Sequence, residues 1–283
     1  MSYVKVRDFK HEVKNGELYI AFSTLSSVSE IKGIEVLTNL RLLSLTSNEI
    51  TEINGLNKLV GLKKLFLDEN KITSLVDLSS LTNLRVLVLD NNNISRIAGL
   101  RNLSKLNLLS LNDNQIKEIR ELRNLTQLRS LLLEGNQIKE IKGLETLTKL
   151  EFLFLNNNQI KEIKGLENLI NLHTLYLNRN KIKEIKGLEN LTNLHILYLN
   201  ANKIKEIKGL KNLFNLRELY LGKNQIKSLK GLGNLKSLEK LCIKNNYFPP
   251  KILEGLGGVD VGGCAYSPKR FVEHCMKFQK KTL

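Results

Sequence analysis

The side chains that could bind a metal or carry catalysis are few. His173 and His195 lie 22 residues apart at equivalent positions of a repeating pattern, so their imidazole rings should be neighbours. Two imidazoles at this spacing could share a metal ion, but the next equivalent positions, Glu151 and Arg217, do not complete a ligand set. Solvated histidines at an edge of the fold are therefore favoured over a metal site.

No other motif indicates catalysis. Cys264, His274 and Cys275 lack the spacing of a zinc finger. The sequence holds no phosphate-binding glycine loop, no G-x-S-x-G elbow and no pair of acids placed for acid–base chemistry. We therefore expect a non-enzymatic protein with no cofactor, no metal and no small-molecule substrate.

Repeats position these side chains. An asparagine recurs every 22 residues without insertion, at Asn48, Asn70, Asn92, Asn114, Asn136, Asn158, Asn180, Asn202, Asn224 and Asn246. Around it the pattern L-x-x-L-x-x-L-x-L-x-x-N-x-I-x-x-I-x-x-L runs ten times between Leu37 and about Leu256. A period of about 20 to 29 residues with this pattern is the leucine-rich-repeat signature, in which each repeat supplies one short parallel strand and a return segment.

One repeat, Leu147 to Asn168, shows how the residues divide. Its strand leucines point inward, and alternation turns residues 152, 154 and 156 outward. Ile160, Ile163 and Leu166 have a three-residue spacing, which predicts a 3₁₀-like or irregular return segment. Gly165 permits a bend there. We expect Asn158 to turn inward and to hydrogen-bond backbone groups of its own and the next repeat.

The 22-residue length and the I-x-x-I-x-x-L second half resemble the SDS22-like class of leucine-rich-repeat proteins, over roughly four-fifths of the chain. The resemblance implies an α/β solenoid with a curved parallel β-sheet on its concave face and a 3₁₀ or irregular convex side. We expect an N-terminal cap with a degenerate repeat at 1–36, ten repeats at 37–256 and a C-terminal cap with a short helix at 257–283.

SDS22-like proteins hold a protein phosphatase catalytic subunit on the concave face through aromatic and acidic side chains. The positions that match those columns here are Phe66, Asp68, Asp90, Glu134, Phe154, Tyr176, Tyr198 and Tyr220. The chain has no tryptophan, and its C-terminal segment differs from the cap usual in this class. The resemblance therefore implies a mode of binding without naming the partner.

The residues themselves also favour a binding surface. Phe154, Tyr176, Tyr198 and Tyr220 occupy one outward column in four consecutive repeats, and Phe152 lies beside them on the same face. One interpretation is that they are strand formers packing against one another. A lined-up aromatic stripe flanked by polar columns is, however, typical of a protein-binding surface, and we favour that interpretation.

Lysines of the motif KEIK, in the return segments, supply much of the net charge of +16. They form two lysine ladders, Lys117, Lys139, Lys161, Lys183, Lys205 and Lys227, and Lys142, Lys164, Lys186, Lys208 and Lys230. Interleaved glutamates offset part of this charge, which favours a solvated outer face. The alternative is an electrostatic surface for nucleic acid or anionic membrane.

The two ends depart from the repeat pattern. Asn15-Gly16 is a two-residue turn signal, and Leu18, Val28, Ile31 and Ile34 continue the repeat spacing. After Pro249-Pro250 we expect a helix from about Pro268 to Lys280, with Phe271, Cys275 and Phe278 closing the end of the core. The alternative for this helix is a free amphipathic segment for a membrane or partner.

Three cysteines are too few and odd in number for a disulfide framework, which favours a reducing compartment. The sequence MSYVKVRDFKHEVKNG has no apolar h-region, and no run approaches about 18 apolar residues. We expect a cytoplasmic protein that is monomeric before it binds its partner; a homo-oligomer is a further alternative. The predicted function is a non-catalytic scaffold that binds a globular protein, for example as a regulatory subunit of a phosphatase or another signalling protein.

Overall fold

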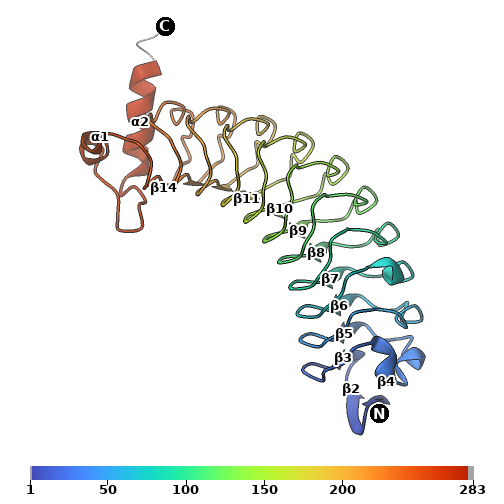
Figure 1. Cartoon of the computed structure of the whole chain (residues 1–283). Coiled ribbons are helices and arrows are strands. Elements are labelled where there is room, and N and C mark those ends of the chain that lie inside the picture. The colour runs from blue at the N-terminus through green and yellow to red at the C-terminus, as the bar shows by residue number, and fades with distance from the viewer. Residues whose placement is uncertain (1, 280–283) are drawn as a thin grey trace. The chain divides into compact units, whose positions relative to one another are not determined.

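The computed structural model describes residues 2–279, apart from the side chains of four residues (77, 250, 278 and 279). The chain forms two compact units, one ending at Gln137 and one beginning at Ile138. Each unit is a stack of turns, and each turn holds one strand and one return segment (Figure 1). This division differs from the three segments expected from the repeat pattern, which stay a prediction about where the repeats begin and end.

The strands of each unit are short and parallel. In the N-terminal unit they are β3 (Glu17–Tyr19), β5 (Leu42–Ser44), β6 (Lys64–Phe66), β7 (Val86–Val88), β8 (Leu108–Ser110) and β9 (Ser130–Leu132). In the C-terminal unit they are β10 (Phe152–Phe154), β11 (Thr174–Tyr176), β12 (Ile196–Tyr198), β13 (Glu218–Tyr220) and β14 (Lys240–Cys242). Within each unit, from β5 onward, the residues of one strand pair with those 22 positions later in the next strand, as Leu153 does with Leu175. The predicted parallel β-sheet solenoid is confirmed.

Leucine and isoleucine fill the interior of every turn. Leu153, Leu155, Ile160 and Ile163 are all fully buried. Burying one such side chain stabilises the fold by about 1.5 to 3 kcal/mol. A single turn has no second layer to cover this face, so each turn depends on its neighbours in the stack.

The return segments run as irregular chain with local tight turns. In the repeat described above, the Leu169 N–H donates to the Leu166 carbonyl and the Leu172 N–H to the Leu169 carbonyl, at 3.0 and 2.9 Å. These bonds span three residues, as the spacing predicts. Gly165 has φ +77°, and a Cβ there would lie 2.5 Å from the Ile141 carbonyl oxygen. Three short 3₁₀ helices are described, η1 (Val28–Glu30), η2 (Ile34–Val36) and η3 (Val76–Leu78), all in the N-terminal unit.

The recurring asparagines are buried and link adjacent turns. In Asn180, Nδ2 donates to the carbonyls of Leu177 and Leu155 at 3.1 and 2.8 Å, and Oδ1 accepts the Ile160 N–H at 2.9 Å. Leu177 belongs to the same repeat, whereas Leu155 and Ile160 belong to the preceding one. The prediction of backbone bonds to the same repeat is confirmed. The prediction that they reach the next repeat is wrong, because the side chain points toward the preceding repeat in the stack.

The N-terminal end is covered by a small antiparallel sheet. It consists of β1 (Ser2–Val6), β2 (Phe9–Val13) and β4 (Ile31–Lys32), in the order β2-β1-β4. The predicted turn at Asn15-Gly16 is present, with φ of 53° and 77°. It leads into β3, which joins the parallel sheet beside β5. Leu18 is fully buried, so the degenerate first repeat takes part in the core.

At the other end the chain forms α1 (Pro250–Gly255) and α2 (Pro268–Gln279). Phe271 and Cys275 of α2 are buried, and the Cys275 thiol donates to the Leu229 carbonyl at 3.0 Å. This helix therefore packs on the last turns; the side chain of Phe278 lies outside the described part of the chain. Within residues 2–279, none of the helices is long and apolar enough to cross a membrane.

Cys242 and Cys264 form a disulfide. Cys264 lies on a segment that pairs antiparallel with β14, where the Ala265 N–H donates to the Leu241 carbonyl at 2.7 Å. From the cysteine count we expected no disulfide framework and a reducing compartment; the structure nevertheless contains this one disulfide. The count could not show that Cys264 returns to the free edge of the last strand. A reducing compartment and a cytoplasmic location stay predictions, and this disulfide argues against them.

Candidate functional site

The aromatic residues of the outward column form a continuous stack in the C-terminal unit. The ring centroids of Phe154 and Tyr176 are 4.5 Å apart, those of Tyr176 and Tyr198 4.2 Å, and those of Tyr198 and Tyr220 3.8 Å. The ring planes differ by 13° or less. The parallel strands impose this arrangement, because they place equivalent side chains side by side at the strand spacing.

Stacking covers the faces of the rings but leaves their outer edges accessible. All four stacked residues are half-buried, and Phe152 beside them is 39% exposed. The rings therefore do pack against one another, as the first interpretation holds, and part of each ring stays accessible to a partner. What faces solvent is an ordered row of ring edges, together with the hydroxyl groups of three tyrosines.

The three tyrosines are held neutral. Burial, followed by the neighbouring Tyr198 hydroxyl, raises the pKa of Tyr176 to about 12. Burial and then the neighbouring Tyr220 hydroxyl raise the pKa of Tyr198 to about 12. For Tyr220 the causes of a pKa of about 12 are burial and then a hydrogen bond donated to the Glu218 carboxylate, at 2.6 Å. The row therefore offers hydroxyl groups, and no tyrosinate, at neutral pH.

The C-terminal end of the stack is basic. The Lys240 ammonium lies 5.3 Å from the centre of the Tyr220 ring, a cation–π contact. A hollow of about 250 Å³ adjoins it, lined by Tyr198, Tyr220, Lys223, Lys244 and the Cys242–Cys264 disulfide. Lys223, Lys240 and Lys244 outnumber the Glu218 carboxylate here, so a partner that covers the stack would meet net positive charge at this end.

Beside the stack runs a column of amides, Asn156, Asn178 and Asn200. The Oδ1 atom of each is buried and has no hydrogen-bond partner within residues 2–279. This differs from the equivalent positions of the N-terminal unit, where the Glu134 N–H donates to Asn112 Oδ1 at 2.8 Å. The repeat pattern predicts polar columns beside the aromatic stack, but it gives no signal for these unpaired acceptors.

The remaining predicted site residues lie in the N-terminal unit. Phe66 is half-buried on β6, and Asp68 accepts the Thr46 hydroxyl at 3.0 Å. Asp90 accepts the Ser110 hydroxyl at 2.5 Å and the Asn112 N–H at 2.8 Å. Burial raises the pKa of Asp90, which these hydrogen bonds partly counteract. Asp90 is therefore engaged by its own neighbours, and the predicted residues form two groups, one in each unit.

The histidine pair is adjacent, as the repeat predicts. The His173 and His195 rings stack 5.3 Å apart and are parallel within 7°. Each Nδ1 donates to a backbone carbonyl two residues earlier, at 2.7 Å, so in a neutral ring the acceptor lone pair is on Nε2. Parallel rings direct these lone pairs side by side rather than toward a shared point. No cluster of three or more metal-ligating side chains occurs among the described residues.

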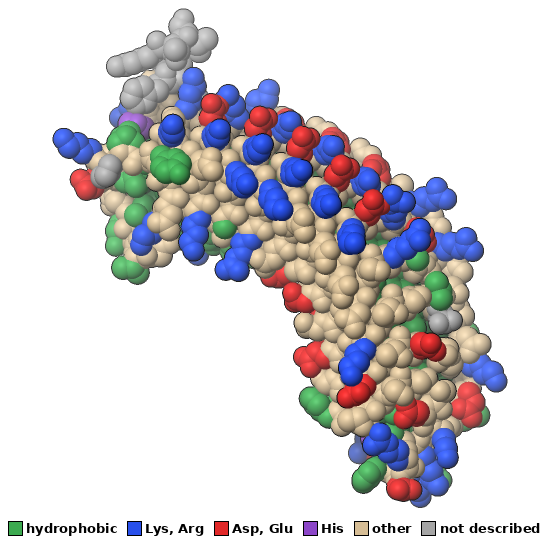
Figure 2. Space-filling model, in the orientation of Figure 1, with side chains coloured by type: hydrophobic (Ala, Val, Ile, Leu, Met, Phe, Trp, Pro, Cys, Tyr) green, Lys and Arg blue, Asp and Glu red, His purple; other side chains and the backbone are tan. Residues whose placement is uncertain are grey.

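The lysine ladders lie on the return segments. Figure 2 shows the lysine and arginine side chains in rows, with acidic side chains between them. Within single turns Lys142 pairs with Glu140 at 3.6 Å, Lys164 with Glu162 at 3.9 Å and Lys186 with Glu184 at 3.7 Å. Such exposed pairs add at most about 1 kcal/mol each to stability. They do offset the positive charge locally.

Sequence models of known families match most of the repeat region. The model described as "Leucine Rich repeats (2 copies)" matches residues 126–168, 170–212 and 215–256, and the model "Leucine rich repeat" matches residues 82–138. The chain belongs to the leucine-rich-repeat family. Proteins of this family typically act as scaffolds for protein interactions. A search of the curated proteins found no match.

Several solved structures resemble this leucine-rich-repeat protein. An internalin (inlF) of Listeria monocytogenes is 36% identical, with a TM-score of 0.68 over 86% of this chain and 77% of that one. Internalin C2 of the same species is 30% identical, with a TM-score of 0.55 over 72% of this chain and 81% of that one. The ectodomain of the Arabidopsis thaliana receptor kinase GASSHO1/SCHENGEN3, solved in complex with CASPARIAN STRIP INTEGRITY FACTOR 2, is 25% identical, with a TM-score of 0.66 over 82% of this chain and 30% of that one.

Proposed function

We propose that this leucine-rich-repeat protein is a non-catalytic scaffold that binds a globular protein on the outer sheet face of β10–β14. The aromatic stack is the observation that carries the proposal. Its ring edges and hydroxyl groups are fixed by the strands, so little side-chain entropy is lost when a partner covers them. Rigid aromatic side chains that combine apolar area with a polar tip are typical of binding hot spots.

The stack also indicates what kind of surface would fit. Ring edges carry partial positive charge, and Lys223, Lys240 and Lys244 add full positive charge at the end near Tyr220. The complementary partner surface presents apolar groups and carbonyl oxygens along the stack and a carboxylate at its basic end. The acidic residues of the N-terminal unit form a separate candidate surface.

We further propose that the partner is a signalling protein, with a protein phosphatase catalytic subunit as the first to test. This rests on the resemblance of the 22-residue repeats to SDS22-like proteins. The C-terminal segment with α1 and α2 does not follow the cap usual in that class, so the test requires the purified catalytic subunit itself.

The proposal predicts that Tyr176→Ala combined with Tyr198→Ala abolishes partner binding while the solenoid stays folded. Truncating a hot-spot aromatic typically costs about 2 kcal/mol or more of binding free energy. A matched control is Ile170→Ala combined with Phe214→Ala, because both side chains are exposed, at 52% and 54%, yet lie outside the strands. The assay is affinity capture with identification by mass spectrometry, followed by titration of the purified partner.

The comparison of the two double variants decides the proposal. Loss of binding in the tyrosine variant alone supports it, provided that circular dichroism shows a folded chain. Equal binding by both variants and the wild type would exclude the aromatic stack as the interface. Failure of a phosphatase catalytic subunit to bind would remove only the finer proposal about the partner.

A further inference from the structure

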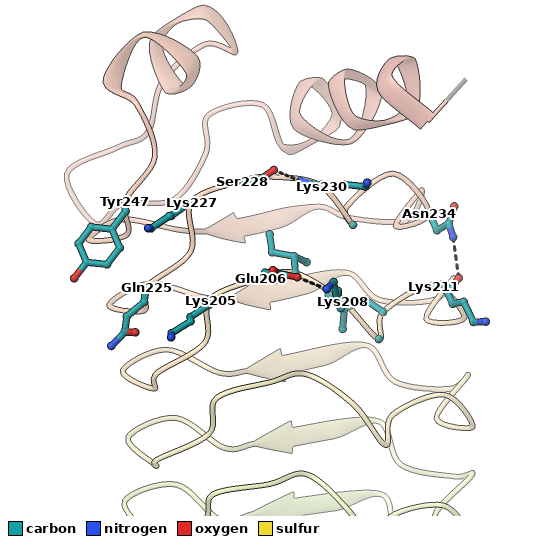
Figure 3. Close-up of a pocket in the computed structure, with 14 residues that line it drawn as sticks. Lys205, Glu206, Lys208, Lys211, Gln225, Lys227, Ser228, Lys230, Asn234 and Tyr247 are labelled. Atoms are coloured by element: carbon teal, nitrogen blue, oxygen red, sulfur yellow. Dashed lines mark hydrogen bonds and ion pairs between the residues drawn. The ribbon is translucent and has the colours of Figure 1, made fainter. Parts of the chain in front are cut away.

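One hollow on the return segments differs in charge from its neighbours. It lies between the turns at 205–211 and 227–234 and has a volume of about 670 Å³ (Figure 3). We define the lysine hollow by its charged lining residues, Lys205, Lys208, Lys211, Lys227, Lys230 and Glu206. Five lysines thus face one glutamate.

The equivalent hollow one turn earlier is nearly balanced. Four lysines and three glutamates line it, Lys183, Lys186, Lys205, Lys208, Glu184, Glu189 and Glu206. Another hollow in the same unit is lined by three lysines and two glutamates. The excess positive charge is therefore a local feature of the lysine hollow and not a general property of the lysine ladders.

Substitutions of the repeat sequence explain this difference. At the position of Glu189 the next turn has Lys211, and at the position of Glu206 the following turn has Ser228. Earlier turns hold glutamate at both positions. The position of Lys211 is glutamate at 145 and 167, and the position of Ser228 is glutamate at 140, 162 and 184. The acidic side chains that offset the ladder elsewhere are thus missing here, whereas the lysines are kept.

The remaining glutamate is already engaged. Glu206 pairs with Lys208 of its own turn, and this hydrogen bond is the main cause that lowers the pKa of Glu206; the charge of Lys230 lowers it further. Within residues 2–279, no salt bridge joins Lys205, Lys211 or Lys227 to a carboxylate. Their ammonium groups are exposed and are available to an anion from solution.

The floor of the hollow is fixed by backbone packing. Gly231 has φ +110°, and a Cβ at this position would collide with the Ile207 carbonyl oxygen of the preceding turn. Ile207 and Leu210 beneath it are buried. Lys205 and Lys227 lie toward the end near Tyr247, and Lys208 and Lys211 lie toward the other end (Figure 3). Lysines therefore line both ends of a hollow whose base does not need to rearrange.

We propose that the lysine hollow binds a compact polyanion, a small molecule that carries several phosphate or sulfate groups. Its volume lies in the range of about 300 to 1,000 Å³ typical of small-molecule sites. Lysine ammonium groups are point charges that bind phosphate or sulfate oxygens from many directions. The lining residues include no arginine and, in Tyr247, one aromatic ring, which disfavours recognition of nucleic-acid bases.

The test uses isothermal titration calorimetry with three probes, inorganic tripolyphosphate, sucrose octasulfate and a single-stranded oligonucleotide. The first variant combines Lys211→Glu with Ser228→Glu, which restores the residues of the preceding turns and so should fold. The control combines Lys139→Gln, Lys161→Gln and Lys164→Gln, which gives the same change in formal charge around a different hollow.

We expect the restored variant to bind the small polyanion at least about tenfold more weakly, and the control to bind it within about twofold of the wild type. Affinity should fall between about 50 mM and about 200 mM salt. The ratio between tripolyphosphate and sucrose octasulfate distinguishes a phosphate from a sulfate ligand. A gain-of-charge variant, Glu184→Ser with Glu189→Lys, gives the neighbouring hollow five lysines and one glutamate without changing the lysine hollow, and it should create a second site and raise the stoichiometry.

Three results would overturn the proposal. The first is that neither small anion binds at the lower salt concentration. The second is that both variants lose affinity for the small anion equally, which would mean that the positive charge of the whole surface attracts it. The third is that the oligonucleotide binds more tightly than the small anions and is weakened equally by both variants, which would assign the lysine ladders to nucleic-acid binding. None of these outcomes concerns the aromatic stack, which is tested separately.

Discussion

Replacing Asn180 by alanine should destabilise the C-terminal unit through one identifiable group. In the folded chain Asn180 Oδ1 accepts the buried Ile160 N–H at 2.9 Å, and Nδ2 donates to the Leu155 carbonyl at 2.8 Å. Alanine leaves that N–H without a partner in the core, which costs about 1–3 kcal/mol. The freed carbonyls add less, because carbonyl oxygens tolerate incomplete pairing better than N–H groups do.

The matched comparison is Asn200→Ala in a neighbouring column. Asn200 Oδ1 accepts no hydrogen bond within the described residues, so removing it leaves no donor unpaired. We expect this variant to lose less than about 1 kcal/mol. Urea unfolding followed by circular dichroism measures both changes, provided that the slope of the transition is unchanged.

Hydrogen exchange gives a local readout that does not depend on two-state unfolding. The Ile160 amide should lose protection in Asn180→Ala and keep it in Asn200→Ala. Equal stability losses in the two variants, or an Ile160 amide that stays fully protected in both, would show that the asparagines do not link the turns as described.

Two further predictions follow from the tyrosine stack and the cysteines. Because the pKa of Tyr176, Tyr198 and Tyr220 is about 12 in the folded chain and about 10 in the unfolded chain, the folded chain holds more protons between these values, and stability should fall as pH rises through this window. Tyrosinate absorbance that shows all tyrosines titrating near 10 in the folded chain would contradict this. Thiol counting after unfolding without reductant should find one thiol, Cys275, and three after reduction; three in both samples would exclude the disulfide.

The sequence by itself determined the solenoid. A 22-residue period kept without insertion places equivalent residues on adjacent parallel strands, and the strand alternation decides which of them face outward. From this the column of Phe154, Tyr176, Tyr198 and Tyr220 and the adjacency of His173 and His195 could both be predicted. Each follows from local geometry that repeats.

Only the tertiary structure decided the contacts between neighbouring turns and the structure at the ends of the repeat array. It showed that the asparagines bind the preceding turn, that the rings stack with their faces covered, and that Cys264 returns to Cys242. It also showed that Lys211 and Ser228 border the same hollow. Both substitutions can be read from the sequence. Their joint effect on the charge of the hollow depends on which return segments are neighbours in space, and the packing between turns decides which segments are neighbours.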